Sequence, residues 1–180
     1  MKLKIQVKEL VEGCMPVINK KGDWIDLIAA HDMEIRASQA GIQYQENNAK
    51  YRDVTTPVAY IPLGVAIKLP KGLEAIVASR SSGPKKLKVF IPNGIGIIDN
   101  SYNGNDDQWY YVASPMENVC VHKGDRICQF RIQLSQKATM WQKLRWLFSS
   151  GVEIVRVNHL SKKSRGGLGS TGIKSIGGEV

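Results

Sequence analysis

Cysteine and histidine are scarce in this sequence of 180 residues, and the few that occur do not cluster. Three cysteines lie at positions 14, 120 and 128 without a C-x-x-C pair, and three histidines lie apart from them at positions 31, 122 and 159. An odd number of scattered cysteines argues against a disulfide framework, and the lack of a cysteine and histidine cluster argues against a zinc site. We therefore expect a fold held together by its own hydrophobic core.

Long apolar runs are also missing. No stretch approaches the roughly 20 apolar residues that a membrane-spanning helix requires. Residues 1–10 alternate lysine with apolar residues, which differs from the continuous apolar segment of a signal peptide. We expect a cytoplasmic protein that makes no membrane contact.

What the sequence does contain is typical of one globular domain. Hydrophobic residues make up 43% and charged residues 23%, which are ordinary values for a chain with a single core. The net charge of +9 indicates an anionic partner, which is nucleic acid, a membrane surface or a phosphorylated small molecule. Charge alone does not choose among them. No aromatic-rich RNA-binding signature accompanies the basic clusters, so we expect no nucleic-acid partner.

Short apolar segments recur along the chain, separated by Gly, Asp, Asn and Pro turns. This pattern predicts an all-β fold, either a sandwich or a barrel of the jelly-roll kind. Two short strands and a turn are expected within Val58–Leu69. The other predicted strands are Lys2–Val7, Trp24–Ile28, Leu73–Val77, Leu87–Ile91, Trp109–Ala113, Asn118–Val121, Ile127–Leu134 and Val152–Val157.

Two segments depart from the strand pattern. Ala37–Thr56 is rich in Gln, Asn and Ser and has no sustained period, so we interpret it as a long surface loop or insertion. Thr139–Phe148 has the spacing of an amphipathic helix, and Trp146 falls outside its apolar face. The helix either packs on the sheet or offers Trp146 to a protein partner. The apolar face comprises Met140, Trp141, Leu144, Leu147 and Phe148.

The segment Asn93–Gly104 carries the clearest chemical signal. Its glycines and apolar residues indicate a strand that turns tightly and presents Asp99 and Tyr102 beyond a buried Ile97–Ile98 pair. A carboxylate at the rim of a water-poor site is ionised at neutral pH and is placed to deprotonate a water molecule. The alternative is a β-hairpin in which Asp99 only caps the turn.

Three other polar positions stand out. Asp26 interrupts an apolar strand, where it is either a hydrogen-bonded structural carboxylate or part of a site. The run Arg80-Ser81-Ser82 offers a planar guanidinium and two hydroxyls, which suit phosphate oxygens but also occur in ordinary turns. Gln129 interrupts the apolar run that follows Arg126. It is either satisfied by neighbouring backbone or faces a ligand.

The C-terminal segment, residues 161–180, is rich in glycine and has too little apolar surface for a core of its own. Its glycines at positions 167, 169 and 172 match G-x-G-x-x-G only formally, because the strand, helix and acidic residue of a dinucleotide fold are missing around them. A Walker P-loop fails as well, because Ile173 separates Gly172 from Lys174. We interpret the segment as an arm whose amides, hydroxyls and Arg165 wrap a polyphosphate.

Five segments in this order resemble the five ordered motifs of the trimeric dUTPase family, in particular its Bacillus and Bacillus-phage branch. The resemblance spans nearly the whole chain, and five motifs at plausible spacing are far more specific than any one of them. The segments are Trp24–Leu27, Ser79–Ser82, Asn93–Gly104, Gly124–Gln129 and Arg165–Gly172.

The resemblance implies a homotrimeric enzyme of jelly-roll-like fold that hydrolyses dUTP to dUMP and pyrophosphate. Each site would be assembled from three subunits, with Mg²⁺ held on the triphosphate. In this scheme Asp99 activates the water that attacks the α-phosphate, and Tyr102 stacks against the sugar. Asn93 reads the uracil edge together with the backbone of Gly96, Ile97 and Ile98.

By the same resemblance, Arg80, Ser81 and Ser82 hold phosphate oxygens from a neighbouring subunit. Gln129 contacts the α-phosphate, and Asp26 acts on Mg²⁺ through a bound water molecule. The arm closes from the third subunit, and its substrate-binding residues are Arg165, Leu168, Gly169, Ser170 and Thr171.

Several positions depart from the family pattern. Leu168 replaces the phenylalanine that usually stacks on uracil, Ser79 replaces a proline before Arg80, and Ser101 occupies a position that is often acidic. We expect residues 1–160 to form the β-domain, with inserts near 37–56 and 137–150, and residues 161–180 to form the arm.

Two alternatives stay open. A dCTP deaminase shares the fold, but it would need a second arginine soon after Arg80 and an additional catalytic glutamate. The second is a dUTPase-like regulatory module that binds a protein, which the two inserts favour.

Overall fold

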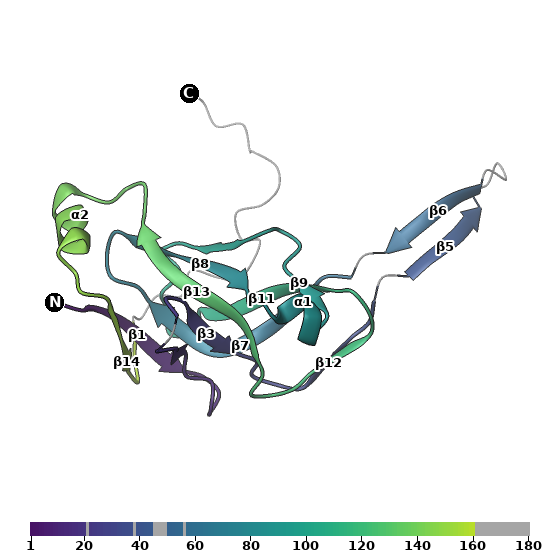
Figure 1. Ribbon diagram of the computed structural model, residues 1–180, viewed down its shortest axis with the longest axis horizontal. Coiled ribbons are helices and arrows are strands. Elements are labelled where there is room, and N and C mark those ends of the chain that lie inside the picture. The colour runs from purple at the N-terminus through teal and green to yellow at the C-terminus, as the bar shows by residue number, and fades with distance from the viewer. Residues whose placement is uncertain (21, 38, 45–49, 56, 161–180) are drawn as a thin grey trace, which may run out of the picture.

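The computed structural model describes residues 1–20, 22–37, 39–44, 50–55 and 57–160 (Figure 1). Its helices are α1 (Gly83–Lys86) and α2 (Met140–Leu147). Its strands are β1 (Leu3–Glu9), β2 (Val17–Ile18), β3 (Ile25–Ile28), β4 (Met33–Ile35), β5 (Gln39–Tyr44), β6 (Lys50–Thr55), β7 (Ala59–Lys68), β8 (Leu73–Ser79), β9 (Val89–Phe90), β10 (Gly96–Ile98), β11 (Gln108–Pro115), β12 (Val119–Val121), β13 (Arg126–Leu134) and β14 (Val152–Arg156).

Two five-stranded sheets form the body of the protein, which confirms the predicted all-β class. One sheet has the order β14-β1-β7-β11-β9 and the other has the order β10-β8-β13-β3-β2. Alternate residues of the strands point into one shared core, as in β1, where Leu3, Ile5 and Val7 are buried. The rings of Trp109 on β11 and Phe130 on β13 meet edge to face at 5.2 Å and so join the two sheets.

One predicted pair of strands is a single strand. The structure has one continuous strand, β7, where the sequence suggested two strands and a turn at Pro62 and Gly64. β7 pairs with β1 through Val65–Lys68 and with β11 mainly through Ala59–Pro62. Gly64 has φ of +64°, and its carbonyl accepts hydrogen bonds from Leu10 and Val11. The glycine therefore bends the strand where its pairing changes, and no turn is needed.

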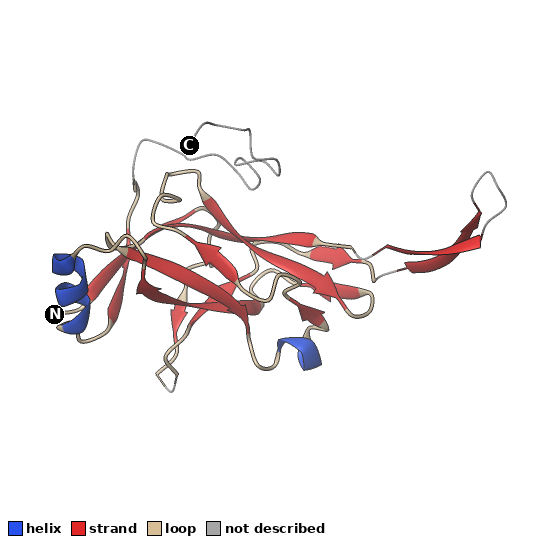
Figure 2. Cartoon of the chain, turned by 90° about the horizontal axis from the view of Figure 1, so that it is seen from above, coloured by secondary structure: helices blue, strands red, loops and turns tan. Residues whose placement is uncertain are grey.

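The segment Ala37–Thr56 was also predicted wrongly as a loop. β5 and β6 form an antiparallel hairpin with a continuous register from Gln39↔Thr55 to Tyr44↔Lys50. Figures 1 and 2 both show this hairpin extending away from the two sheets. The sequence of this segment has no sustained apolar alternation, which is the pattern that would have predicted strands.

The helix lies where the sequence predicts, but its apolar face points the other way. Thr139 caps α2 in a capping box with Gln142. Trp146 packs against the core, whereas the large apolar side chains of the predicted face lie 70% to 81% exposed: Met140, Trp141, Leu147 and Phe148. The helix therefore packs against the core, but through Trp146 and not through the predicted face. A partner contact through this helix stays a prediction.

Candidate active site

A buried carboxylate organises the polar residues at one edge of the second sheet. Asp26 lies in β3 opposite Gln129 of β13 and is only 4% exposed. Its Oδ1 lies 3.0 Å from Nε of Arg80, and its Oδ2 lies 3.2 Å from Nη1 of Arg126. A buried carboxylate is costly unless it is paired and hydrogen-bonded. Each oxygen of Asp26 meets an arginine, which explains an acid within an apolar strand.

The same arginines gather positive charge at this edge. Arg80 also donates from Nη1 to the carbonyl of Arg126 at 3.1 Å, which fixes the plane of its guanidinium. Lys85 and Lys86 in α1 are exposed nearby in the sequence. One carboxylate does not neutralise two arginines, so the cluster keeps a net positive charge. Such a cluster favours an anionic ligand with oxygen acceptors.

Gln129 and the backbone of β8 are tied to this cluster. Gln129 donates from Nε2 to the carbonyl of Ser79 at 3.2 Å. The Ser79 hydroxyl lies 2.6 Å from the Tyr111 hydroxyl, and burial raises the pKa of Tyr111 to about 12. Ser79, which stands where the family usually has a proline, therefore supplies a hydrogen bond between the two sheets. Ser81 is exposed and Ser82 is half-buried just beyond Arg80, so both hydroxyls lie at the surface beside the cluster.

Cys128 adjoins the cluster but is not a nucleophile. Its thiol is buried, and burial, followed by the negative charge of Asp26, raises its pKa well above the usual value. The thiol form is therefore retained at neutral pH, whereas the thiolate is the reactive species.

The segment around Asp99 forms a tight loop after β10. Asp99 is exposed, and its Oδ1 accepts hydrogen bonds from the backbone nitrogen of Ser101 at 2.7 Å and from the Ser101 hydroxyl. The hydroxyl of Tyr102 donates to the carbonyl of Gln108 at 2.8 Å. Burial, followed by the charge of Asp107, raises the pKa of Tyr102. The ring is thus held neutral and fixed beside the exposed carboxylate.

The predicted burial of the Ile97–Ile98 pair is wrong in this single chain. Ile97 is 61% exposed, and Ile98 is half-buried. β10 is an edge strand of the second sheet, and within one chain the outward side chain of Ile97 is not covered by other described residues. Asn93 is exposed in the turn before β10, where Gly94 adopts φ of +75°.

Within one chain, Asp99 and Arg80 lie far apart. Gly96 pairs with Val77 and Ile98 pairs with Ala75 in the antiparallel register of β10 and β8. Asp99 therefore lies near the first residues of β8, whereas Arg80 follows its last residue. Six residues from position 74 to position 80, at about 3.3 Å each, place the two backbones about 20 Å apart. A triphosphate-sized ligand cannot contact both groups of one chain at a single reacting centre.

Part of the predicted site falls outside the described residues. This applies to Arg165, Leu168, Gly169, Ser170 and Thr171, all of which lie within 161–180.

The residues for a metal ion are few. Among the described residues no group of three or more His, Cys, Asp and Glu side chains is placed to hold a metal. Mg²⁺ in nucleotide sites usually keeps several waters and is bound by one or two carboxylates plus the phosphates. Asp26 is the carboxylate in the arginine cluster, and both its oxygens are engaged by arginines. These residues fit a metal that arrives on a phosphate chain and meets Asp26 through water.

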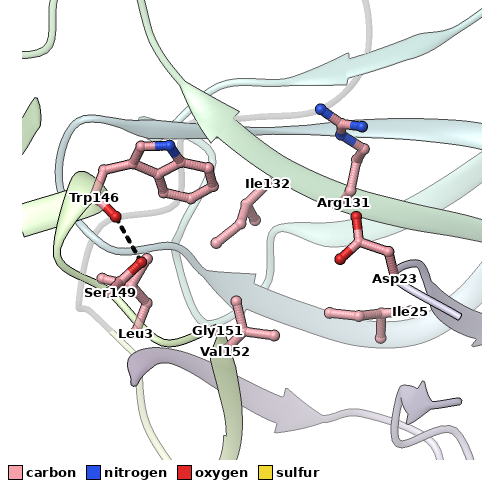
Figure 3. A pocket seen from close by; sticks show the side chains of 9 residues that line it. All are labelled: Leu3, Asp23, Ile25, Arg131, Ile132, Trp146, Ser149, Gly151 and Val152. Atoms are coloured by element: carbon pink, nitrogen blue, oxygen red, sulfur yellow. Dashed lines mark hydrogen bonds between the residues drawn. The ribbon is translucent and has the colours of Figure 1, made fainter. Parts of the chain in front are cut away.

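A separate hollow of about 350 Å³ lies between α2 and the ends of the sheets (Figure 3). None of the described site residues lines it. The Trp146 indole covers one side, and the α2 end is closed by a hydrogen bond from the Ser149 hydroxyl to the Trp146 carbonyl at 2.7 Å. Trp146 anchors the helix by packing against the core beside this hollow. The hollow is unrelated to the predicted site.

Arg126 is a site residue that the sequence reasoning did not assign. It begins β13, where the register with β3 shifts between Arg126 and Cys128. This irregularity belongs to the sheet and cannot be read from side-chain alternation. Arg126 pairs with Ile28, two residues along β3 from Asp26, and an arginine three residues before Gln129 was the one signal that the sequence offered.

The sequence of this chain is similar to those of known proteins. The family described as dUTPase matches residues 54–144. A prophage-derived deoxyuridine 5'-triphosphate nucleotidohydrolase of Bacillus subtilis is 37% identical over 174 residues, which are 96% of this chain and 100% of that protein. The deoxyuridine 5'-triphosphate nucleotidohydrolase of Rickettsia conorii is 29% identical over 172 residues, which are 95% of this chain and 97% of that protein.

Solved structures share the fold. The dUTPase of Streptococcus mutans superposes with a TM-score of 0.56 at 22% identity, and the match covers 71% of this chain and 91% of that one. A variant dUTPase from phage phi11 of S. aureus, in which a structural Mg(II) ion is coordinated, gives a TM-score of 0.57 at 18% identity over 76% of this chain and 94% of that one. At these identities the likeness concerns the fold alone.

Proposed function

This chain belongs to the dUTPase family, and on that premise we propose that it hydrolyses dUTP to dUMP and pyrophosphate. The observation that carries the proposal is the cluster of Arg80, Asp26 and Arg126, which presents two guanidinium groups around one buried carboxylate. A nucleoside triphosphate is a polyanion, and guanidinium groups donate paired hydrogen bonds to its phosphate oxygens. Arg80, Ser81, Ser82 and Gln129 would hold the phosphates.

Asp99 is the proposed base. It is exposed at the end of β10, and its Oδ1 is fixed by two donors of Ser101. A carboxylate held in this way can orient a water molecule towards the α-phosphate and accept its proton, a role typically worth about 10² to 10⁴ in rate. The bond from phosphorus to the bridging oxygen breaks, and pyrophosphate leaves.

The nucleoside is placed by the neighbours of Asp99. Asn93 and the backbone of β10 offer donors and acceptors to the uracil edge, and Tyr102 offers a fixed ring to the sugar. In the proposal the arm residues close over the bound nucleotide from another subunit.

The homotrimer is part of the proposal because one chain is incomplete. Asp99 and Arg80 are about 20 Å apart along β8, so a second copy must supply one of them. The exposed Ile97 of the edge strand β10 is a candidate contact between copies.

Mg²⁺ would be bound mainly by the triphosphate, with Asp26 contacting it through water. When bound, the ion neutralises phosphate charge and polarises the phosphoryl oxygens. Release of an Asp26 oxygen for this contact requires that Arg80 or Arg126 turns from Asp26 towards the phosphates. Both arginine side chains are partly exposed, at 26% and 48%, and have room to turn.

We also propose a cytoplasmic location and a protein partner for α2. The described cysteines are free thiols, which suits a reducing compartment, and no described helix is long and apolar enough to cross a bilayer.

The partner would contact the exposed apolar face of α2 that lies opposite Trp146. A contiguous exposed face of this kind is typical of interaction sites.

The test of the function is product analysis of the purified protein with Mg²⁺ and each of dUTP, dCTP, dTTP and UTP. The proposal predicts dUMP and pyrophosphate from dUTP and little product from the others. Deamination of dCTP would instead indicate the deaminase of the same fold. No product from any nucleotide would indicate a binding module.

A further inference from the structure

The loop that carries Asp99 is pinned by the side chain of the next residue. Asn100 donates from Nδ2 to three backbone carbonyls, those of Leu69 at 3.2 Å, Pro70 at 2.8 Å and Leu73 at 3.1 Å. Leu69 and Pro70 lie in the turn between β7 and β8, and Leu73 is the first residue of β8. One amide nitrogen has two protons, so the three carbonyls share them. The half-buried Asn100 thereby fastens the Asp99 backbone to the start of β8 and the turn before it.

Ser101 acts on the carboxylate itself. Both its backbone nitrogen and its hydroxyl donate to the same oxygen, Oδ1 of Asp99. Hydrogen bonds to a carboxylate are strong, favour its ionised form and restrict its rotation. The hydroxyl is the donor that depends on residue type, since every residue except proline would offer the backbone nitrogen.

The same loop is closed on its far side. Asn103 donates from Nδ2 to the carbonyl of Asn100, and Gly104 donates its backbone nitrogen to Oδ2 of Asp107 at 2.7 Å. Asp107 is buried. The pairing of Ile98 with Ala75 fixes the chain before Asp99 and these hydrogen bonds fix it after Asp99, so the geometry of the loop is set before a substrate binds. Such preorganisation is what a general base requires, because small displacements of the reacting groups reduce rates steeply.

From this geometry we propose that Asn100 and Ser101 are positioning residues for the base, with Asn100 fixing the backbone under Asp99 and Ser101 orienting its carboxylate and keeping it ionised. The inference rests on the proposed role of Asp99 in dUTP hydrolysis. It adds two residues that have no assigned role in that reaction, one of them at a position where this chain departs from the acidic residue common in the family.

The test compares dUTP turnover of Ser101→Ala, Ser101→Thr and Asn100→Asp across about pH 5 to 9. Ser101→Ala should lower kcat about ten-fold or more with KM nearly unchanged. The acid limb of its pH profile of kcat should move to higher pH, because the Asp99 carboxylate loses a hydrogen-bond donor that favours its ionised form. Ser101→Thr retains the hydroxyl and should restore both the rate and the acid limb. Asn100→Asp removes the donors to the three carbonyls and should lower kcat.

Matched controls are available elsewhere in the chain. Ser149 donates its hydroxyl to the Trp146 carbonyl, and Asn118 accepts from the backbone nitrogen of Ala37. Ser149→Ala and Asn118→Asp should leave kcat and the acid limb unchanged. Thermal unfolding and the oligomer mass of every variant would show that losses of rate do not come from misfolding.

The outcomes separate this inference from the proposed function. If the wild-type protein releases no dUMP from dUTP, the proposed function fails. If Asp99→Asn keeps normal turnover, dUTP hydrolysis stands, but Asp99 is not the base and the positioning inference fails with that role. If Asp99→Asn is inactive but Ser101→Ala and Asn100→Asp behave like their controls, the positioning inference alone is overturned. A fall in kcat for Ser101→Ala with an unmoved acid limb, or the same fall in Ser101→Thr, would also overturn it, because either result indicates a merely structural role.

Discussion

Replacement of Asp26 by asparagine should both destabilise the protein and weaken its phosphate site. The substitution keeps the shape of the side chain but leaves one oxygen in place of two. One of the two arginines, at 3.0 Å from Oδ1 and 3.2 Å from Oδ2, then faces an amide NH₂ group. Asp26→Asn also removes the only charge that compensates Arg80 and Arg126 at this position.

The size of the effect follows from burial. Removal of one partner of a fully buried ion pair costs about 3 to 5 kcal/mol. Arg126 is 48% exposed, so water screens much of its share, and the expected loss falls to about 2 to 3 kcal/mol. For a domain of this length that corresponds to a fall of roughly 4 to 12 °C in Tm.

The assay is thermal unfolding together with dUTP turnover, and the matched control is Asp32→Asn. Asp32 is 77% exposed, and its Oδ1 accepts a hydrogen bond from the backbone nitrogen of Lys123 at 2.7 Å. The same chemical change there should cost less than about 0.5 kcal/mol and leave turnover unchanged. If Asp26→Asn is no more harmful than Asp32→Asn in either measurement, the buried carboxylate does not organise the arginines and our account of the phosphate site is refuted.

Two further predictions concern the anchor of α2 and the link between the sheets. Trp146→Ala should lower the free energy of unfolding by about 2 to 3 kcal/mol, because the indole packs against the core beside the hollow. Trp141→Ala, at an 81% exposed position, should change it by less than about 0.5 kcal/mol. Equal effects of the two substitutions in urea titrations would contradict the observed orientation of the helix. Burial raises the pKa of Tyr111 to about 12, so the unfolded chain loses this proton first, and stability should fall by up to about 3 kcal/mol as the pH rises from about 10 to 12. Tyr111→Phe should lack this part of the alkaline loss, and an identical pH dependence in the two proteins would rule Tyr111 out as its source.

The strands were predictable because burial alternates along them. In β1 and β8 every second residue enters the core, and such alternation is visible in the sequence itself. The hairpin of β5 and β6 was missed because its sequence lacks a sustained alternation of apolar residues. The extent of α2 was predictable from the spacing of its apolar residues, and its start agrees with the capping box of Thr139 and Gln142.

The side of α2 that faces the core was not predictable, because it depends on the packing of Trp146 against the core and not on the hydrophobic periodicity of the helix. The candidate site shows the same division. Asp26, Arg80 and Asp99 were found as unusual residues in their local sequence, but the contact between Asp26 and Arg126 depends on a register shift in β13. The separation of Asp99 from Arg80 depends on the pairing of β10 with β8, which local sequence does not show.

The central claim is that one active site takes Asp99 and Arg80 from different copies of the chain. Co-expression of Asp99→Asn and Arg80→Gln chains with different affinity tags, followed by isolation of mixed oligomers, tests it directly. Each variant alone should be inactive towards dUTP. The isolated mixed trimers should recover about one third of the wild-type activity, because one site in three then receives both intact residues from two neighbouring chains. Mixed oligomers that stay as inactive as the separate variants would show that both residues act within one chain and would contradict the account.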